Sequence, residues 1–147
     1  MFRYLVKDTL DVFHEMAQSN EAEMETGDLY NPFQEAYAAF WLEFIFAHYD
    51  GLKLLICCSK GSAYESFEEQ MIEYEEAGDK RYYEILKASG RNVKEISDLQ
   101  WHMLATAYVH LIFEIVRHDM SREEAIKHMR FVSELLYPGW KDIYDIK

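Results

Sequence analysis

The sequence predicts an all-α fold, a single-domain helical bundle of about six main helices spanning residues 1–147. Three observations indicate this fold class. Apolar residues recur at the spacing of a helix face along most of the chain, only two prolines and six glycines interrupt it, and 50% of the residues are apolar. A chain of this length buries roughly 70% of the surface that its unfolded form exposes, so we expect one packed core.

The first helix is predicted over Phe2–Gln18, where apolar and charged residues occupy opposite faces. Ser19–Gly27 is polar and without periodicity, so it is expected to be a loop or a ragged helical extension. Asn31-Pro32 marks the next helix start, because asparagine caps a helix and proline is tolerated at its first position. That helix is expected to reach about Tyr49 and, being apolar nearly all round, to lie centrally.

Asp50-Gly51 is expected to end this helix, and Leu52–Cys58 to form a short buried one. The two cysteines, Cys57 and Cys58, are neighbours in that apolar run, an arrangement poorly suited to a disulfide or a metal motif. We therefore expect two reduced, buried thiols.

A long helix is predicted over Tyr64–Ser89, with Gly90 as its stop. Its acidic residues are expected to form a solvated face, since most of them point away from its apolar stripe. They are Glu65, Glu68, Glu69, Glu73, Glu75, Glu76 and Asp79.

Two capping-box patterns predict the last main helices, Asp98–His118 and Arg122–Tyr137. Pro138 is expected to close the second, and Gly139–Ile146 to form a terminal helical turn. Because the turn between the two helices is short, they should run as an antiparallel pair.

The Asp98–His118 helix carries an apolar arc of roughly 200°, wider than packing against one core usually needs. The surplus predicts a homodimer in which two helix pairs form a four-helix bundle, although a helix central to its own monomer is the alternative. The predicted interface residues are Leu104, Ile112, Ile115, Val116, Ile126, Met129, Phe131, Val132 and Leu136.

The net charge of −12, without a basic stripe on any predicted helix, argues against direct DNA binding, since DNA is itself strongly negative. The sequence shows neither a secretory leader nor an apolar run of the length needed to span a bilayer. We therefore expect a cytoplasmic protein that has no membrane partner.

Acidic residues and histidines raise the question of a metal site. The Glu-x-x-His signature of helical di-iron proteins does not occur, and the nearest pairs are Asp11 with His14, Glu114 with His118, and Glu124 with His128. Phosphate-binding loops and the common nucleophile motifs are also missing. We expect no catalytic residue, no metal and no cofactor, and therefore no enzyme.

Aromatic and methionine side chains on three predicted helices suggest a pocket for a small apolar or aromatic molecule, with His48 as one orienting hydrogen-bond partner. The alternative is that these side chains simply form the core. The predicted ligand-binding residues are Trp41, Phe44, His48, Phe67, Met71, Tyr74, Trp101 and Tyr108.

Several segments together resemble the C-terminal domain of TetR-family transcriptional regulators. They are Phe40–Phe44, Leu54–Glu65, Ala107–Ala125 and Tyr137–Trp140. The resemblance implies that the chain binds a small-molecule effector, forms a homodimer and belongs to a repressor.

In this family a helix-turn-helix head binds DNA, and residues 1–19 resemble the helix that links such a head to the effector domain. The sequence carries no recognition helix, so we expect DNA contact only through a head outside this chain. The alternative is a stand-alone helical interaction or ligand-sensing protein that does not bind DNA.

Overall fold

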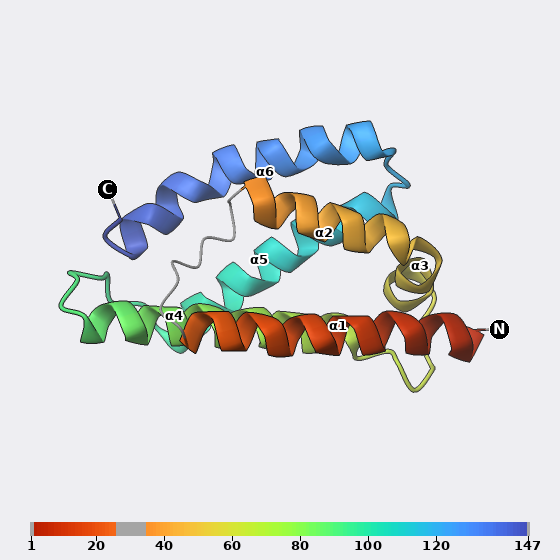
Figure 1. Cartoon of the computed structure of the whole chain (residues 1–147), viewed down its shortest axis with the longest axis horizontal. Helices are drawn as coiled ribbons and strands as arrows, with labels where there is room; N and C mark the ends of the chain where they lie inside the picture. Colours follow the sequence, from red (N-terminus) through yellow and green to blue (C-terminus); the bar gives the residue numbers. More distant parts are fainter. Residues whose placement is uncertain (1, 26–34, 147) are drawn as a thin grey trace.

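The computed structural model describes residues 2–25 and 35–146, and within these ranges the chain is all-helical (Figure 1). The predicted fold class is confirmed. None of the described helices is long and apolar enough to cross a membrane. The helices are α1 (Phe2–Glu25), α2 (Glu35–Ala47), α3 (Tyr49–Cys57), α4 (Phe67–Ala88), α5 (Asp98–Arg117) and α6 (Arg122–Ile143).

Helix α5 is the central element, lying between α4 on one side and α6 on the other (Figure 1). Its most extensive contact is with α4, and it also packs against α3 and α6. Helix α2 contacts α6 and α3, whereas α1 packs against α3 and α4. The expectation that α2 is central is wrong, because its Phe40, Glu43 and Ala47 are exposed.

The wide apolar arc of α5 is filled largely by its own chain. Ile112, Ile115 and Val116 are buried between α5 and its neighbours, and so are Met129 and Val132 on α6. Assigning these five residues to a subunit interface is therefore wrong. Their burial agrees with the alternative prediction, in which α5 is central to its own monomer. Of the other predicted interface residues, Leu136 is half-buried, whereas Leu104, Ile126 and Phe131 are exposed.

Helix α6 continues through Pro138 to Ile143, although this proline was expected to end it. The turn beyond Pro138 is held by packing: the Trp140 ring stacks on Tyr82 with 6.0 Å between centroids, and Tyr144 is completely buried. These contacts offset the hydrogen bond that proline removes from the helix. Helix α1 likewise runs beyond Gln18, to Glu25.

The break between α2 and α3 falls at His48, where φ is −120° and ψ is 27°, and not at Asp50-Gly51, which lies inside α3. The predicted start of α2 at Asn31-Pro32 lies outside the described residues. At the other end of α3, the two cysteines are exposed, so the expectation of buried thiols is wrong. Helix α3 buries the face that carries Leu52 and Leu55, and Cys57 lies on the opposite side.

Both predicted capping boxes are present. In the first, the Gln100 amide N–H donates to the Ser97 hydroxyl (3.2 Å) and the Ser97 amide N–H donates to the Gln100 side chain (2.9 Å). Ser121 and Glu124 form the same reciprocal pair at 3.1 and 2.8 Å. These bonds satisfy backbone donors at the helix start and fix where α5 and α6 begin.

The buried apolar side chains form two clusters. We call the first the main core; it contains side chains from each of the helices α1, α2, α3, α4 and α5 and from part of α6. Its buried members include Phe13, Trp41, Phe44, Leu55, Phe67, Met71, Tyr108, Ile112, Phe113 and Met129. We call the second the C-terminal cluster; its buried members are Tyr82, Tyr83, Leu86, Trp101 and Tyr144. A cavity lies where residues of the two clusters meet.

Candidate ligand-binding site

The α4–α5–α6 cavity is a partly open space of about 190 Å³ between these three helices. Tyr108 of the main core and Trp101 of the C-terminal cluster both line it. The remaining lining residues are Glu75 and Asp79 from α4, Leu104 and Ala107 from α5, and Leu135, Leu136, Gly139, Trp140 and Ile143 from α6.

Neighbouring rings hold the aromatic part of the cavity wall. Trp101 meets Tyr83 edge-on with 5.4 Å between ring centroids, and Trp140 lies parallel to Tyr82 at 6.0 Å. Tyr144 contacts both tryptophans, at 6.0 and 4.7 Å. Because both tryptophan rings pack on neighbouring rings, this part of the wall is preformed and needs little ordering when a molecule binds.

Two carboxyl groups on successive turns of α4 line the same cavity. Only 5% of Glu75 and 8% of Asp79 is exposed. The pKa of Asp79 is raised well above its usual value, first by burial and then by the negative charge of Glu75. The nearby Tyr144 hydroxyl donates to the backbone carbonyl of Asp79 at 3.1 Å, and the pKa of Tyr144 is raised by its burial and by the same two acids.

The burial of Glu75 and Asp79 corrects the expectation that the acidic run of α4 is a solvated face. Sequence reasoning missed them as site residues, although a signal was present. At 100° per residue, both fall within the arc that runs from Met71 to Tyr83, between side chains that are buried. An acidic residue inside an apolar stripe therefore marks this site, whereas exposed Glu69 and Glu73 do face solvent.

The eight predicted ligand-binding residues do not meet in one cavity. Trp101 and Tyr108 line the α4–α5–α6 cavity. The other six lie elsewhere: Trp41, Phe44, Phe67 and Met71 are buried in the main core, Tyr74 is half-buried there, and His48 lies between α2 and α3.

Ring contacts explain why those residues belong to the core. Phe67 stacks on Phe113 with 5.9 Å between centroids, and Trp41 meets Phe44 at 6.0 Å. The His48 ring contacts Phe44 at 5.1 Å, and its Nδ1 lies 3.6 Å from a carboxylate oxygen of Asp8. His48 is therefore directed towards α1 and not into the α4–α5–α6 cavity.

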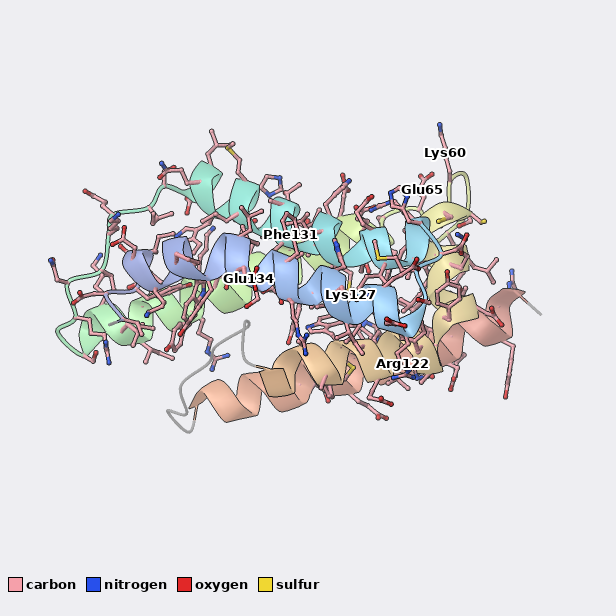
Figure 2. All side chains as sticks on the ribbon, turned by 90° about the horizontal axis from the view of Figure 1, so that it is seen from above. Lys60, Glu65, Arg122, Lys127, Phe131 and Glu134 are labelled. Carbon is pink, nitrogen blue, oxygen red and sulfur yellow. The ribbon has the colours of Figure 1, made fainter. Side chains whose placement is uncertain are left out.

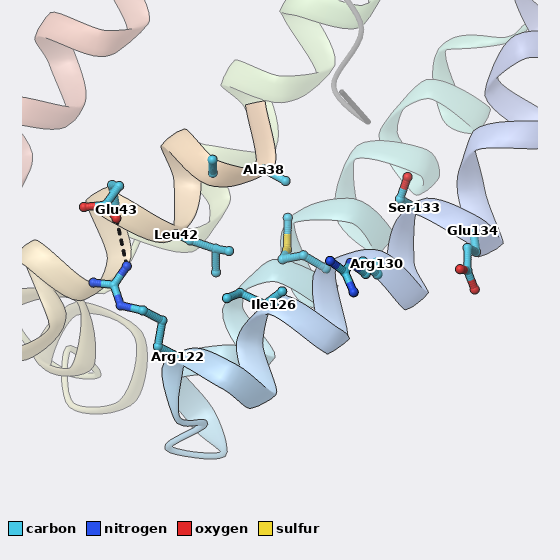
Figure 3. Close-up of a pocket in the computed structure, with 10 residues that line it drawn as sticks. Ala38, Leu42, Glu43, Arg122, Ile126, Arg130, Ser133 and Glu134 are labelled. Atoms are coloured by element: carbon cyan, nitrogen blue, oxygen red, sulfur yellow. Dashed lines mark hydrogen bonds and ion pairs between the residues drawn. The ribbon is translucent and has the colours of Figure 1, made fainter. Parts of the chain in front are cut away.

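A second hollow, the α2–α6 groove, is larger and more open, at about 700 Å³ (Figure 3). Ala38 and Ala39 leave space on α2, and Leu42 and Ile126 contribute apolar surface. An ion pair between Arg122 and Glu43, 2.8 Å long, closes one end, whereas Arg130, Ser133 and Glu134 lie along α6 towards the other (Figure 3). Among the described residues that line this groove, no charged side chain is buried, and the groove is more open than the α4–α5–α6 cavity.

The Glu/His pairs considered for a metal have other partners. Glu114 binds both His118 (2.6 Å) and Arg117 (3.3 Å), and Arg117 supplies a positive charge that opposes a cation. Glu124 belongs to the capping box, and His128 bonds the Leu111 carbonyl at 2.6 Å. Within the described ranges, no three His, Cys, Asp or Glu side chains are placed to hold a metal ion.

Apolar side chains are exposed on the outer surfaces of α5 and α6. On α6, Phe131 stands beside Lys127 and Glu134 (Figure 2), and 59% of Phe131 is exposed. Leu135 and Leu104 are exposed as well, and both line the α4–α5–α6 cavity. Apolar surface therefore extends outwards from the edge of this cavity.

Fold and site together define an all-helical protein with a partly open cavity lined by aromatic, acidic and aliphatic side chains. Comparison with protein-family models, with curated proteins and with solved structures finds no match to this chain. The cavity itself is therefore the feature of this chain that indicates a function.

Proposed function

We propose that this chain is a small-molecule-binding domain and that the α4–α5–α6 cavity is its binding site. The observation that carries the proposal is a partly open cavity between three helices, lined by aromatic rings and two buried acids. Ligand sites in proteins are typically concave and mostly apolar, with a few polar groups that orient the ligand. The cavity has this composition, whereas none of the described residues lining the larger α2–α6 groove is a buried polar group that could orient a ligand.

In biological terms, we propose the effector-binding part of a TetR-type repressor. The helix order, which ends in two helices joined by a short turn, is what the sequence resemblance implies. The net charge of −12 is consistent with DNA binding through a separate head only. A stand-alone ligand-sensing or interaction protein is the alternative, and salt-sensitive binding of duplex DNA by this chain would contradict both.

The experiment compares two substitutions on α6 that place a leucine in different hollows. Gly139 lines the α4–α5–α6 cavity, and a Cβ atom built on it has no neighbour within 4 Å, so Gly139→Leu adds bulk at the cavity wall without a clash at its Cβ. Ser133 lines the α2–α6 groove, so Ser133→Leu is the matched control. Both proteins are screened by thermal shift against benzyl alcohol, indole, benzylammonium and choline.

We expect at least one of these probes to raise the melting temperature of the wild type and of Ser133→Leu, but not that of Gly139→Leu. A probe at 100 times its dissociation constant stabilises a protein by about 2.7 kcal/mol, which is readily measured. Two results would contradict the proposal: no probe stabilises the wild type, or Gly139→Leu binds as well as the wild type does.

We also propose that two copies of the chain form a homodimer through the exposed apolar side chains of α5 and α6. Phe131, Leu135 and Leu104 are 59%, 58% and 39% exposed. Groups of exposed large apolar side chains often mark protein–protein contact sites. This interface uses the outer surface of the helix pair in place of the buried residues first predicted.

Light scattering tests the dimer. We expect a mass of about twice 17.5 kDa for the wild type. The double variant Phe131→Asp, Leu135→Asp should be monomeric, because burying two unpaired charges costs more free energy than the apolar contacts of the interface contribute. Tyr4→Asp, a change of the same kind at a residue of α1 that is 79% exposed, should leave the mass unchanged. A monomeric wild type at micromolar concentration would exclude this interface.

A further inference from the structure

The end of α3 places two thiols side by side on the surface. Cys57 is the last residue of the helix, and the chain leaves it at Cys58, where φ is −129° and ψ is 10°. The Cys58 amide N–H still donates to the Leu54 carbonyl at 3.0 Å, which ties this residue to the last helical turn. Both cysteines are free and exposed. Two sulfur atoms on neighbouring residues are therefore accessible to one incoming atom.

A direct disulfide is a poor product for this pair. Adjacent Cα atoms are about 3.8 Å apart across a trans peptide, whereas disulfide-bonded cysteines usually have Cα atoms about 4.4–6.8 Å apart. A bond of about 2.05 Å between the two sulfurs would therefore strain the backbone. A soft atom with a bond of about 2.3 Å to each sulfur lets the sulfurs stay at least about 3 Å apart. The pair thus suits a bridging atom better than a direct bond.

The number of protein ligands narrows the choice of that atom. The chain contains two cysteines. Within the part of the chain that the structure describes, no third His, Cys, Asp or Glu side chain joins a group that could hold a metal ion. Zinc usually takes three or four protein ligands, so two thiols do not satisfy it. A soft atom that needs only two further bonds, such as trivalent arsenic already bonded to one organic group, matches the pair.

We propose that Cys57 and Cys58 form a binding site for monosubstituted organic compounds of trivalent arsenic, with one bond from each sulfur to the same arsenic atom. In water such a compound carries two hydroxyl groups on arsenic. Each sulfur forms an As–S bond as one As–O bond breaks, and each departing hydroxide takes up the proton that the thiol has lost. Two water molecules are released, and arsenic and sulfur keep their oxidation states.

This site is separate from the one in the proposed function. The residues that line the α4–α5–α6 cavity come from α4, α5 and α6, whereas the thiols lie at the end of α3. A molecule in the cavity and an arsenical on the thiols would therefore bind at different places. The two proposals can fail independently of each other.

Lys53 places an ammonium group beside the thiol pair. It lies one helical turn before Cys57, and its Nζ donates to Asp119 Oδ1 at 2.9 Å and to the Val116 carbonyl at 3.0 Å. The pKa of Lys53 is raised, first by the hydrogen bond to Asp119, and the thiolate charges of the two cysteines act in the same direction. The ammonium is thus within electrostatic range of both sulfurs. Because the thiolate is the reacting form of cysteine, a positive charge there favours the reaction.

The test is native mass spectrometry of the reduced wild-type chain after reaction with phenylarsine oxide, in an excess of β-mercaptoethanol. We expect one phenylarsenic group per chain, with the loss of two thiol protons. A single As–S bond exchanges with the competing monothiol, whereas the second bond of a pair forms within one molecule at a high effective concentration. Dimercaptopropanol, a competing dithiol, should release the arsenic.

Variants then distinguish a thiol pair from two separate thiols. Cys57→Ser and Cys58→Ser should each weaken retention of the arsenical by about 100-fold. The matched control combines Cys58→Ser with Glu134→Cys, which puts the second thiol at an exposed position of α6. Figure 2 shows Glu134 well apart from Lys60, which closely follows the cysteines. This control should retain no more arsenic than the single variants do.

Circular dichroism of each variant checks that the fold is kept, as expected for serine at two exposed positions. Two results would overturn the proposal. In the first, the wild type holds no arsenic in excess monothiol. In the second, the control with separated thiols holds it as firmly as the wild type.

Discussion

The main core and the C-terminal cluster are both rich in aromatic rings, but they differ in how close they lie to charge. The main core contains aliphatic and aromatic side chains that pack directly on one another, as Phe67 does on Phe113. The C-terminal cluster lies beside the two buried acids, and the three helices that form it border a cavity. The Tyr144 hydroxyl of this cluster donates to the backbone carbonyl of Asp79.

This difference indicates a division of roles. A closed core of apolar rings contributes stability, since burial of apolar surface is the main favourable term in folding. Buried acids beside a cavity lower stability, and proteins commonly carry such features at functional sites. We therefore expect substitutions in the main core to change stability alone, and substitutions of the buried acids to change stability and binding in opposite directions.

The largest expected effect concerns the main core. Phe67→Ala removes a ring that stacks on Phe113 and meets Phe13 edge-on at 6.4 Å, so it should lower the free energy of unfolding by about 3–5 kcal/mol. Urea unfolding followed by circular dichroism measures the change. Binding of benzylammonium by the folded fraction should stay the same, and a loss of affinity there would place the ligand in the main core instead.

The second prediction concerns the cavity. At neutral pH, Asp79→Asn should raise the free energy of unfolding by about 1–3 kcal/mol, because it removes an acid whose ionised form is disfavoured by burial. The folded-state pKa of Asp79 lies above the unfolded value of 3.8. The contribution of Asp79 to the free energy of unfolding is therefore fully present below pH 3.8, and it is lost as the pH rises towards the folded-state pKa.

Denaturant unfolding at several pH values checks this sign. The stability gained by Asp79→Asn over the wild type should grow as the pH rises above 3.8 and then level off. The exposed control Glu73→Gln should stay within about 0.5 kcal/mol of the wild type at every pH. If Asp79→Asn is less stable than the wild type at neutral pH, the carboxylate has a stabilising partner and the contrast between the two clusters is lost.

The smallest expected effect concerns the link between the C-terminal cluster and α4. Tyr144→Phe keeps the buried ring but removes the hydroxyl that donates to the Asp79 carbonyl at 3.1 Å. The free energy of unfolding should fall by about 0.5–1.5 kcal/mol. Thermal unfolding detects a change of this size, and a drop of several kcal/mol would mean that this hydroxyl organises the whole cluster.

Local rules in the sequence were sufficient to place the starts of the last two helices. The capping boxes at Ser97 and Ser121 gave the starts of α5 and α6, because a cap is decided within one turn of backbone. Local rules failed where distant residues intervene. Pro138 marks a helix end in sequence terms, yet Trp140 and Tyr144 reach α4 and keep the helix going.

The candidate site shows the same limit. Helical spacing identified Trp101 and Tyr108 as inward-facing residues, but it grouped them with Trp41 and Phe44, which lie in a different part of the core. Spacing along one helix shows which side chains share a face, and it does not show which helix that face meets.

The sequence by itself determined the all-helical fold, because apolar spacing and helix caps act over a few residues. Only the tertiary structure decided that α5 meets its own chain on most sides, and that Glu75 and Asp79 lie inside while Glu73 lies outside. The reason is physical: the free energy of burying a charge or an apolar face depends on what lies opposite, and that is set by the packing of helices far apart in the chain.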